Sequence, residues 1–240
     1  MTKQFIETVL LALANERKVF WSEADFQFAF AWKLKEMLML KNNNPQSTIN
    51  VRLERRADAL EKRDDEKKSG DAYIDIWVEI DKMVYPIELK YKTIKCTITD
   101  GSEEYKLKQH GASDIGCYLY LKDVKRIEEL SESLGDNFGK GFAIMLTNDH
   151  LYWDKPNTST DNTIFRDFRI HKGRKIVAGA TLDWGTPSDY RPAWQKRLKS
   201  FELNHNYRIN WGDYSNLNEE GEANEKEKMP PFKYTIIEIN

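Results

Sequence analysis

The chain has 240 residues, of which 40% are hydrophobic and 12% aromatic, a composition that excludes a disordered protein and allows a substantial core. Its net charge of −2 is not that of a protein which coats nucleic acid non-specifically. No apolar run approaches the roughly 18 residues needed to cross a membrane, and we see no signal peptide. Cys96 and Cys117 form neither a disulfide framework nor a zinc pattern, so we expect reduced thiols in a cytoplasmic protein.

Two helices are predicted at the start of the chain. The first spans Lys3 to Asn15, where apolar residues recur at helical spacing. The second begins at Ser22, because a serine with an acid three residues later, Asp25, has the character of a capping box, and it continues to about Leu40. Glu23 falls in the first turn of this helix, where the helix dipole favours an acidic residue whatever its function.

Three strands are predicted next, over Ile49 to Arg56, Tyr73 to Ile80 and Met83 to Thr93. The last two are separated only by the polar turn Asp81-Lys82, so we expect them to form a hairpin. Residues 57–70 are predicted to be a charged connection. The second strand alternates most clearly, with isoleucines and a valine on one face and the intervening residues on the other.

The rest of the chain predicts a helix followed by strands. Glu103 to Leu130 is expected to be mostly helical, and Lys140 to Asn148 to be an apolar strand. Three later strands are expected over Lys175–Trp184, Phe201–Trp211 and Phe232–Ile239. We therefore predict a single α/β domain over residues 1–240, with a mixed sheet flanked by helices and a β-rich C-terminal extension over 151–240.

Two carboxylates and an ammonium group are predicted to converge on the hairpin. Asp75 lies in its first strand, and Glu88 and Lys90 share one face of its second strand because they are two residues apart. Pairing of the strands brings Asp75 to the same end as Glu88. Mg²⁺ prefers carboxylate oxygens, a bound metal polarises a phosphoryl oxygen, and the lysine stabilises negative charge or helps to activate water. Phosphodiester hydrolysis uses this set of groups.

An alternative interpretation of Glu88 and Lys90 is an ordinary ion pair on a solvated strand face, in an unrelated α/β protein. The Glu-x-Lys pattern alone favours that interpretation. Asp75 shifts the balance towards a functional site, since an aspartate among isoleucines and a valine is disfavoured in a strand unless it has a use there.

An aspartate in a hydrophobic strand, followed in the next strand by Glu-x-Lys, resembles the PD-(D/E)XK nuclease superfamily. The predicted order over roughly residues 20–150, namely helix, three-stranded meander, helix and strand, is also similar to that family. Ile74 stands where the family name has a proline. The resemblance implies a restriction-endonuclease-like core and a nuclease that uses Mg²⁺ or Mn²⁺. The metal would be bound by Asp75, Glu88 and the backbone carbonyl of Leu89, with Lys90 as a catalytic residue.

The resemblance also implies two further site residues. Many members carry an acid on the first core helix, which would make Glu23 part of the metal or catalytic site. Several place a glutamine on the helix after the Glu-x-Lys strand, which would make Gln109 a helper that orients Lys90 or the substrate. The implied substrate is nucleic acid, with DNA favoured by the resemblance alone, and a homodimer is one expected assembly. The alternative is a catalytically inactive nuclease-like domain that binds nucleic acid or serves as an assembly module.

Two groups of charged residues remain open to more than one interpretation. Arg55 and Arg56, on the first strand, are suited to phosphate through bidentate hydrogen bonds, or they keep an edge strand soluble. Asp123, Arg126 and Glu128 follow one another at helical spacing, which is typical of a surface ion-pair ladder, although Arg126 is also suited to meet a phosphate.

Overall fold

The computed structural model describes residues 1–42, 44–57, 73–156, 163–185, 198–217 and 230–240. Its helices are α1 (Lys3–Glu16), α2 (Glu23–Lys41) and α3 (Ser113–Leu134), with short 3-10 turns at Gly135–Asn137 and Arg166–Phe168. The main sheet contains β1 (Ile49–Arg56), β2 (Tyr73–Ile80), β3 (Met83–Lys92), β6 (Gly141–Thr147), β11 (Trp211–Ser215) and β12 (Phe232–Ile239). The smaller strands are β4 (Cys96–Asp100), β5 (Glu103–Leu107), β7 (Lys175–Ile176), β8 (Thr181–Leu182), β9 (Phe201–Glu202) and β10 (Tyr207–Arg208).

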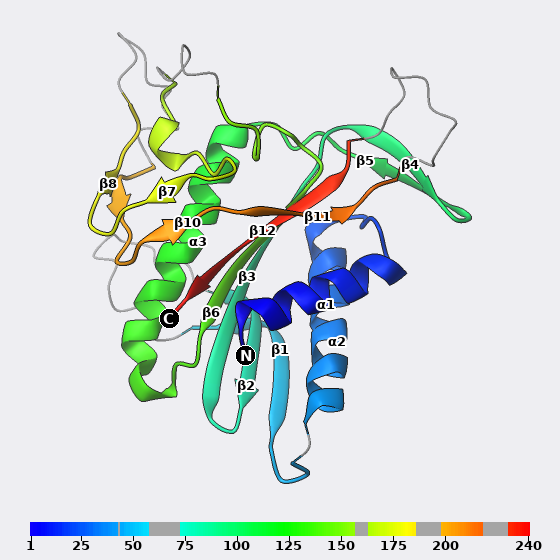
Figure 1. Cartoon of the computed structure of the whole chain (residues 1–240), viewed down its shortest axis with the longest axis vertical. Coiled ribbons are helices and arrows are strands. Elements are labelled where there is room, and N and C mark those ends of the chain that lie inside the picture. The colour runs from blue at the N-terminus through cyan, green and yellow to red at the C-terminus, as the bar shows by residue number, and fades with distance from the viewer. Residues whose placement is uncertain (43, 58–72, 157–162, 186–197, 218–229) are drawn as a thin grey trace.

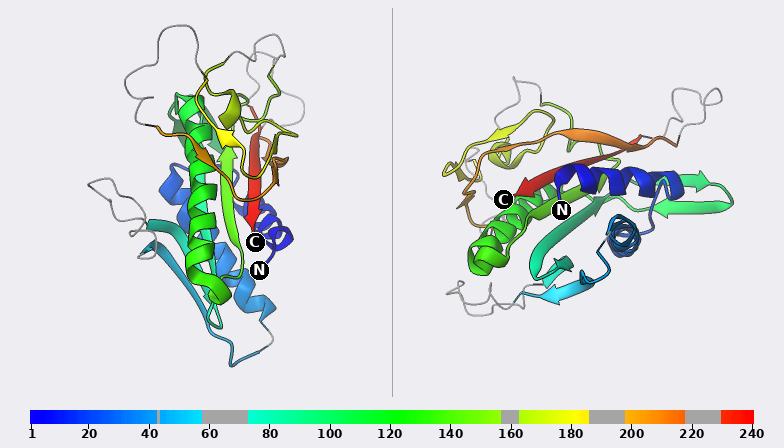
Figure 2. Two further views of the ribbon diagram at one scale, coloured as in Figure 1. Left: turned by 90° about the vertical axis from the view of Figure 1, so that its left-hand side faces the viewer. Right: turned by 60° about the horizontal axis from the view of Figure 1, so that its bottom comes forward.

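The main sheet has the order β1-β2-β3-β6-β12-β11 and lies between two layers of helix (Figure 1). Helices α1 and α2 cover one face, and α3 lies against the other (Figure 2). Strands β3 and β6 are parallel and the other neighbours are antiparallel. The predicted α/β class, with a mixed sheet flanked by helices, is therefore confirmed. Among the described helices, none has the length and apolar character needed to cross a membrane.

Strand β6 shows why its sequence is apolar without interruption. Phe142 and Ile144 pack with α1 and α2, whereas Ala143 and Met145 pack with α3. A strand covered on both faces has no position for a solvated side chain. The sheet thus separates two cores. The Glu88 and Lys90 side chains of β3 lie on the α3 face, where they meet Arg126 and Asp123.

Two local predictions are confirmed in detail. At the start of α2 the Ser22 hydroxyl accepts a hydrogen bond from the Asp25 N–H (3.2 Å), and the Asp25 carboxylate accepts one from the Trp21 N–H (2.9 Å). Between β2 and β3 the turn residues Asp81 and Lys82 have φ of 49° and 82°, the left-handed backbone that two-residue hairpins require. The hairpin that carries the candidate residues is therefore set by its own turn.

The expected helix over Glu103 to Leu130 is wrong in its first part. Strands β4 and β5 form a hairpin there, in which Tyr105 and Leu107 alternate into the core with the period of a strand. Helix α3 begins only at Ser113, directly after Ala112 in a left-handed conformation (φ 62°). The predicted connection over 57–70 lies almost wholly outside the described residues.

The C-terminal third does more than extend the core. Strand β12, confirmed over Phe232–Ile239, pairs antiparallel with β6, and β11 pairs with β12, so both complete the main sheet. The expected strands Lys175–Trp184 and Phe201–Trp211 are broken into short pieces that pair as β7 with β10 and β8 with β9. Gly179, with φ of 70°, turns the chain between β7 and β8 and ends the predicted strand.

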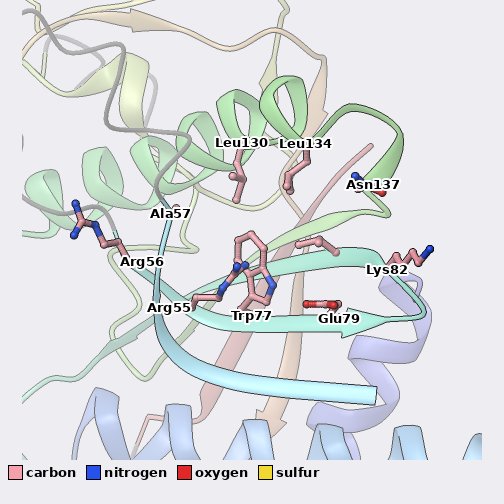
Figure 3. Close-up of a pocket in the computed structure, with 10 residues that line it drawn as sticks. Arg55, Arg56, Ala57, Trp77, Glu79, Lys82, Leu130, Leu134 and Asn137 are labelled. Atoms are coloured by element: carbon pink, nitrogen blue, oxygen red, sulfur yellow. The ribbon is translucent and has the colours of Figure 1, made fainter. Parts of the chain in front are cut away.

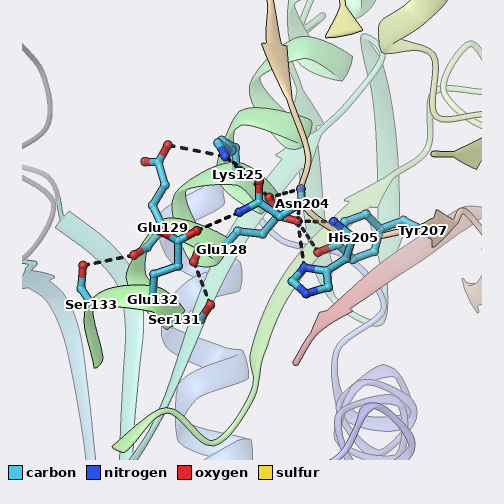
Figure 4. A network of polar contacts seen from close by, with 9 residues as sticks. All are labelled: Lys125, Glu128, Glu129, Ser131, Glu132, Ser133, Asn204, His205 and Tyr207. Atoms are coloured by element: carbon cyan, nitrogen blue, oxygen red, sulfur yellow. Dashed lines mark hydrogen bonds and ion pairs between the residues drawn. The ribbon is translucent and has the colours of Figure 1, made fainter. Parts of the chain in front are cut away.

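A buried glutamate on α3 fixes this C-terminal segment to the helix (Figure 4). The Glu128 carboxylate, fully buried, accepts hydrogen bonds from the backbone N–H groups of Asn204 (2.9 Å) and His205 (3.1 Å) and from the Tyr207 hydroxyl (2.8 Å). Burial and the neighbouring Glu128 charge raise the pKa of Tyr207, which keeps its hydroxyl a donor. The prediction that Glu128 belongs to a surface ladder is therefore wrong, because the C-terminal segment covers it.

Replacing Glu128 with alanine is expected to lower the free energy of unfolding by about 3 kcal/mol, because the change leaves several buried donors without an acceptor. Urea denaturation followed by circular dichroism measures this. Glu129→Ala is the matched control: its side chain is 35% exposed and, among the described residues, pairs with Lys125 at 4.0 Å, so its effect should stay within about 0.5 kcal/mol. Equal effects of the two substitutions would contradict an anchoring role for Glu128.

Candidate active site

The β2–β3 hairpin places Asp75 beside Glu88, as the sequence predicts. The last β2–β3 pair at this end is Ile76 with Ile87, so Asp75 is the next residue along. Its Oδ2 accepts a hydrogen bond from the Leu89 N–H at 2.6 Å, and its carboxyl group interacts electrostatically with that of Glu88. The two carboxyl groups are therefore adjacent.

A glutamine on α2 that was not among the predicted site residues holds the backbone of Asp75. The β1–β2 ladder is interrupted where Glu54 (φ 50°) lies opposite Asp75. Gln27, itself 8% exposed, fills the gap: its Nε2 donates to the Asp75 carbonyl (2.7 Å) and to the Glu54 carboxylate (2.8 Å). Gln27 therefore positions Asp75 through its main chain.

Helix α3 supplies a third acid, which binds Lys90. The Lys90 ammonium lies 2.7 Å from Oδ2 of Asp123, a carboxylate with 2% exposure, and also donates to the Leu89 carbonyl at 3.2 Å. Burial would lower the pKa of Lys90, but the charges of Asp123, Asp75 and Glu23 outweigh burial and raise it. Lys90 is therefore held as a cation.

An arginine from the next turn of α3, Arg126, forms an ion pair with Glu88 of β3. Nη1 of Arg126 lies 2.7 Å from Oε1 of Glu88 and 3.5 Å from Oδ1 of Asp123. Glu88 is 1% exposed, so the alternative of a solvated Glu88–Lys90 pair is wrong. The predicted ion pair between Asp123 and Arg126 is present, but Asp123 is buried, so the prediction of a surface ladder is wrong for that residue. In the sequence, their i, i+3 spacing was the only feature that singled out Asp123 and Arg126.

These five residues, Asp75, Glu88, Lys90, Asp123 and Arg126, are called the charge cluster below. They set three carboxyl groups against two cations in a site with little access to water. Burial raises the pKa of Glu88 well above its ordinary range, and the charges of Asp123 and Asp75 raise it further. Burial likewise raises the pKa of Asp75 and of Asp123, against the opposing charge of Lys90. The cluster has one negative charge more than its own cations balance, which a proton or a bound cation would offset.

Glu23 lies at the border of the charge cluster. It occupies the first turn of α2, as expected, and its Oε2 accepts a hydrogen bond from the Tyr91 N–H at 2.8 Å, with the Lys92 ammonium 4.0 Å away. Its charge acts on both Lys90 and Asp123. The structure therefore brings Glu23 to the site through the backbone of β3.

Gln109 does not join the other predicted residues. It lies exposed in the segment between β5 and α3, and its Oε1 accepts a hydrogen bond from the Lys95 N–H at 3.1 Å. The expectation that it stands on the helix after β3 is wrong, because the β4–β5 hairpin intervenes and α3 begins four residues later. Asp123 takes the place expected of Gln109 as the partner of Lys90.

The donor set at the cluster suits a hard divalent cation. Asp75, Glu88 and the Leu89 carbonyl offer oxygen atoms, which Mg²⁺ and Mn²⁺ prefer. Within the described parts of the chain, no three His, Cys, Asp or Glu side chains form a ready metal-binding group. The expected set differs from such a group, since it contains two carboxylates and a main-chain oxygen. Donor type and surplus negative charge thus fit the metal.

No protein-family model, curated protein or solved structure matches the chain. The interpretation of the candidate site is therefore based on its geometry alone.

Proposed function

We propose that this protein is a metal-dependent nuclease that hydrolyses phosphodiester bonds in nucleic acid, with DNA as the expected substrate. The observation that carries the proposal is the unbalanced charge of the cluster, in which Asp75, Glu88 and Asp123 surround only two cations. Buried carboxylates with raised pKa values next to positive groups are typical of functional sites. A surplus of negative charge is a cost to folding that a bound cation removes.

In this proposal some residues of the cluster would bind the metal, and others would contact the phosphate. Asp75, Glu88 and the Leu89 carbonyl would hold Mg²⁺ or Mn²⁺, which supplies a polarised phosphoryl oxygen and a more acidic bound water. Lys90, kept protonated by Asp123, places a positive charge beside the phosphate as negative charge develops in the transition state. Arg126 offers a planar group suited to phosphate oxygens.

The arrangement of the elements supports a restriction-endonuclease-like core as part of this proposal. Helix α2, the meander β1–β2–β3, helix α3 and strand β6 follow the order expected for that core, and β6 adds to the sheet parallel to β3. The β4–β5 hairpin, helix α1 and the pair β11–β12 would be additions to it. Glu23 and Gln27, both on α2, would then position the two strands that carry the carboxylates.

Calorimetric titration with Mn²⁺ tests the metal site directly. We expect the unmodified protein to bind the ion and Asp75→Ala to lose binding, because the substitution removes a ligand and with it the surplus negative charge of the cluster. Asp154→Ala, which removes an acid with 63% side-chain exposure, should bind as the unmodified protein does. Equally negligible binding by the unmodified protein and Asp75→Ala would contradict the proposal and assign the cluster a purely structural role.

A further inference from the structure

A groove of about 440 Å³ lies between β1, β2 and α3 (Figure 3). We call it the Trp77 groove; its lining includes Arg55, Arg56, Trp77, Glu79, Lys82 and Leu130. Trp77 follows Asp75 by two residues on β2, so both side chains face α3. Leu130 follows Arg126 by one helical turn. The groove is therefore a continuation of the cluster along the same strand and the same helix.

Two features of the groove suit a planar, polar ligand. Trp77 is 4% exposed, and its indole N–H has no hydrogen-bond partner among the described residues. Buried polar groups are nearly always paired, so an acceptor added at this edge of the indole would be stabilising. In addition, the guanidinium of Arg55 lies over the indole, with Cζ 3.9 Å from the ring centroid. Arg55 is thereby fixed at the mouth of the groove.

We propose that the Trp77 groove binds one unpaired nucleotide of the substrate strand, next to the phosphate held at the charge cluster. This inference rests on the proposed nuclease function and adds the substrate class, a single-stranded or locally opened segment. Two residues of β-strand span about 6.6 Å, which suits neighbouring phosphate and base sites. A volume of about 440 Å³ accommodates a single base and sugar, whereas a base pair in a duplex stays stacked and out of reach.

The lining matches the chemistry of a nucleotide. Three basic residues and one acid line the groove, so it favours a phosphate; the acid, Glu79, already faces Arg52 at 3.5 Å. The Trp77 N–H can donate to a carbonyl or ring nitrogen of a base, and arginine planes stack on bases. Val84 and Leu130 supply an apolar floor. A lipid tail or an apolar peptide would not match the charged side chains of Arg55 and Lys82 in the lining.

Fluorescence anisotropy in EDTA tests the groove without any cleavage. The probes are three fluorescein-labelled strands of equal length: oligodeoxythymidylate, the same backbone with every base removed, and a blunt duplex. We expect the unmodified protein to bind the thymidylate at least about 5-fold more tightly than the abasic strand, since stacking of a single base contributes that much. The duplex should also bind more weakly than the thymidylate.

Two substitutions separate the base contact from general charge. Arg55→Gln and Trp77→Phe should each remove most of the preference for bases, while Arg208→Gln, an exposed arginine on β10 outside the groove, should retain it. Thermal melting checks that Trp77→Phe is folded, and Arg55→Gln tests the groove independently. No binding of thymidylate, or a base preference unchanged in both groove variants, would overturn the proposal. A preference for bases without metal-dependent cleavage would instead overturn the proposed nuclease function, while the proposal that the groove binds a nucleotide would remain supported.

Discussion

Replacing Lys90 with methionine is expected to slow cleavage of nucleic acid by about 10²–10³-fold, the usual effect of removing one group that stabilises transition-state charge. Asp123 and Asp75 keep the Lys90 ammonium charged in spite of its burial, so the residue acts as a fixed cation and its loss cannot be replaced by water. Methionine retains the length of the apolar stem, and Asp123 keeps Arg126 at 3.5 Å as a second partner. The variant should therefore fold.

The experiment compares cleavage of single-stranded, duplex, branched and RNA substrates by Lys90→Met with calorimetric binding of Mn²⁺ by the same variant. Metal binding should persist, because the carboxylates remain. Lys106→Met serves as the control, since this lysine is 74% exposed on β5, where it pairs with the exposed Glu104. If Lys90→Met cleaves its best substrate within a few-fold of the unmodified protein, Lys90 has no catalytic role.

Local sequence patterns were sufficient to predict the part of the charge cluster that lies on the strands, namely Asp75, Glu88 and Lys90. Alternation places Asp75 opposite the apolar face of its strand, and the Asp81-Lys82 turn fixes the register that brings it to Glu88. Both effects act within a single hairpin, where side-chain direction follows from the period of two. For this reason the adjacency of Asp75 and Glu88 could be predicted without knowledge of the rest of the fold.

The helix half of the cluster could not be predicted in this way. Whether Asp123 and Arg126 face solvent or β3 depends on how α3 is rotated about its axis against the sheet, which is a property of tertiary packing. For the same reason Gln27 was not singled out and Glu128 was wrongly assigned to the surface: each satisfies backbone groups of a segment distant in sequence. The sequence pattern that could have indicated such a residue is a polar side chain on an otherwise apolar helix face. A polar side chain exposed to solvent produces the same pattern, so the two cases cannot be told apart from sequence.

The last expected result concerns the balance between stability and function at Glu88. Substitution by glutamine should abolish metal binding and cleavage but leave the metal-free protein at least as stable as before. Glutamine has the same shape and no charge, so it removes the surplus negative charge next to Asp123 and Asp75. Removing one partner of a buried ion pair usually destabilises, because the other charge is left uncompensated, but here we expect the loss of repulsion between Glu88 and the carboxylates of Asp123 and Asp75 to outweigh that cost by about 1 kcal/mol. Arg126, released from Glu88, retains Asp123 and a side chain that is 36% exposed.

The sign of the pH dependence follows from the raised pKa of Glu88. A carboxyl group that binds its proton more tightly when folded stabilises the folded state fully below its unfolded pKa, and this contribution is lost as pH rises through the folded pKa. Glutamine cannot lose a proton. Relative to the unmodified protein, Glu88→Gln should therefore melt at about the same temperature in acid and at a higher temperature above neutral pH.

Thermal melting in EDTA across this pH range measures the difference, which should reach about 2–4 °C for about 1 kcal/mol in a chain of this size. Glu104→Gln, at an acid with 55% side-chain exposure, should show no such pH-dependent gain. A Glu88→Gln variant that melts several degrees lower at every pH would mean that the Arg126–Glu88 ion pair is a net source of stability. The cluster would then be balanced without a metal, and the central reason for proposing a catalytic ion at this site would be lost.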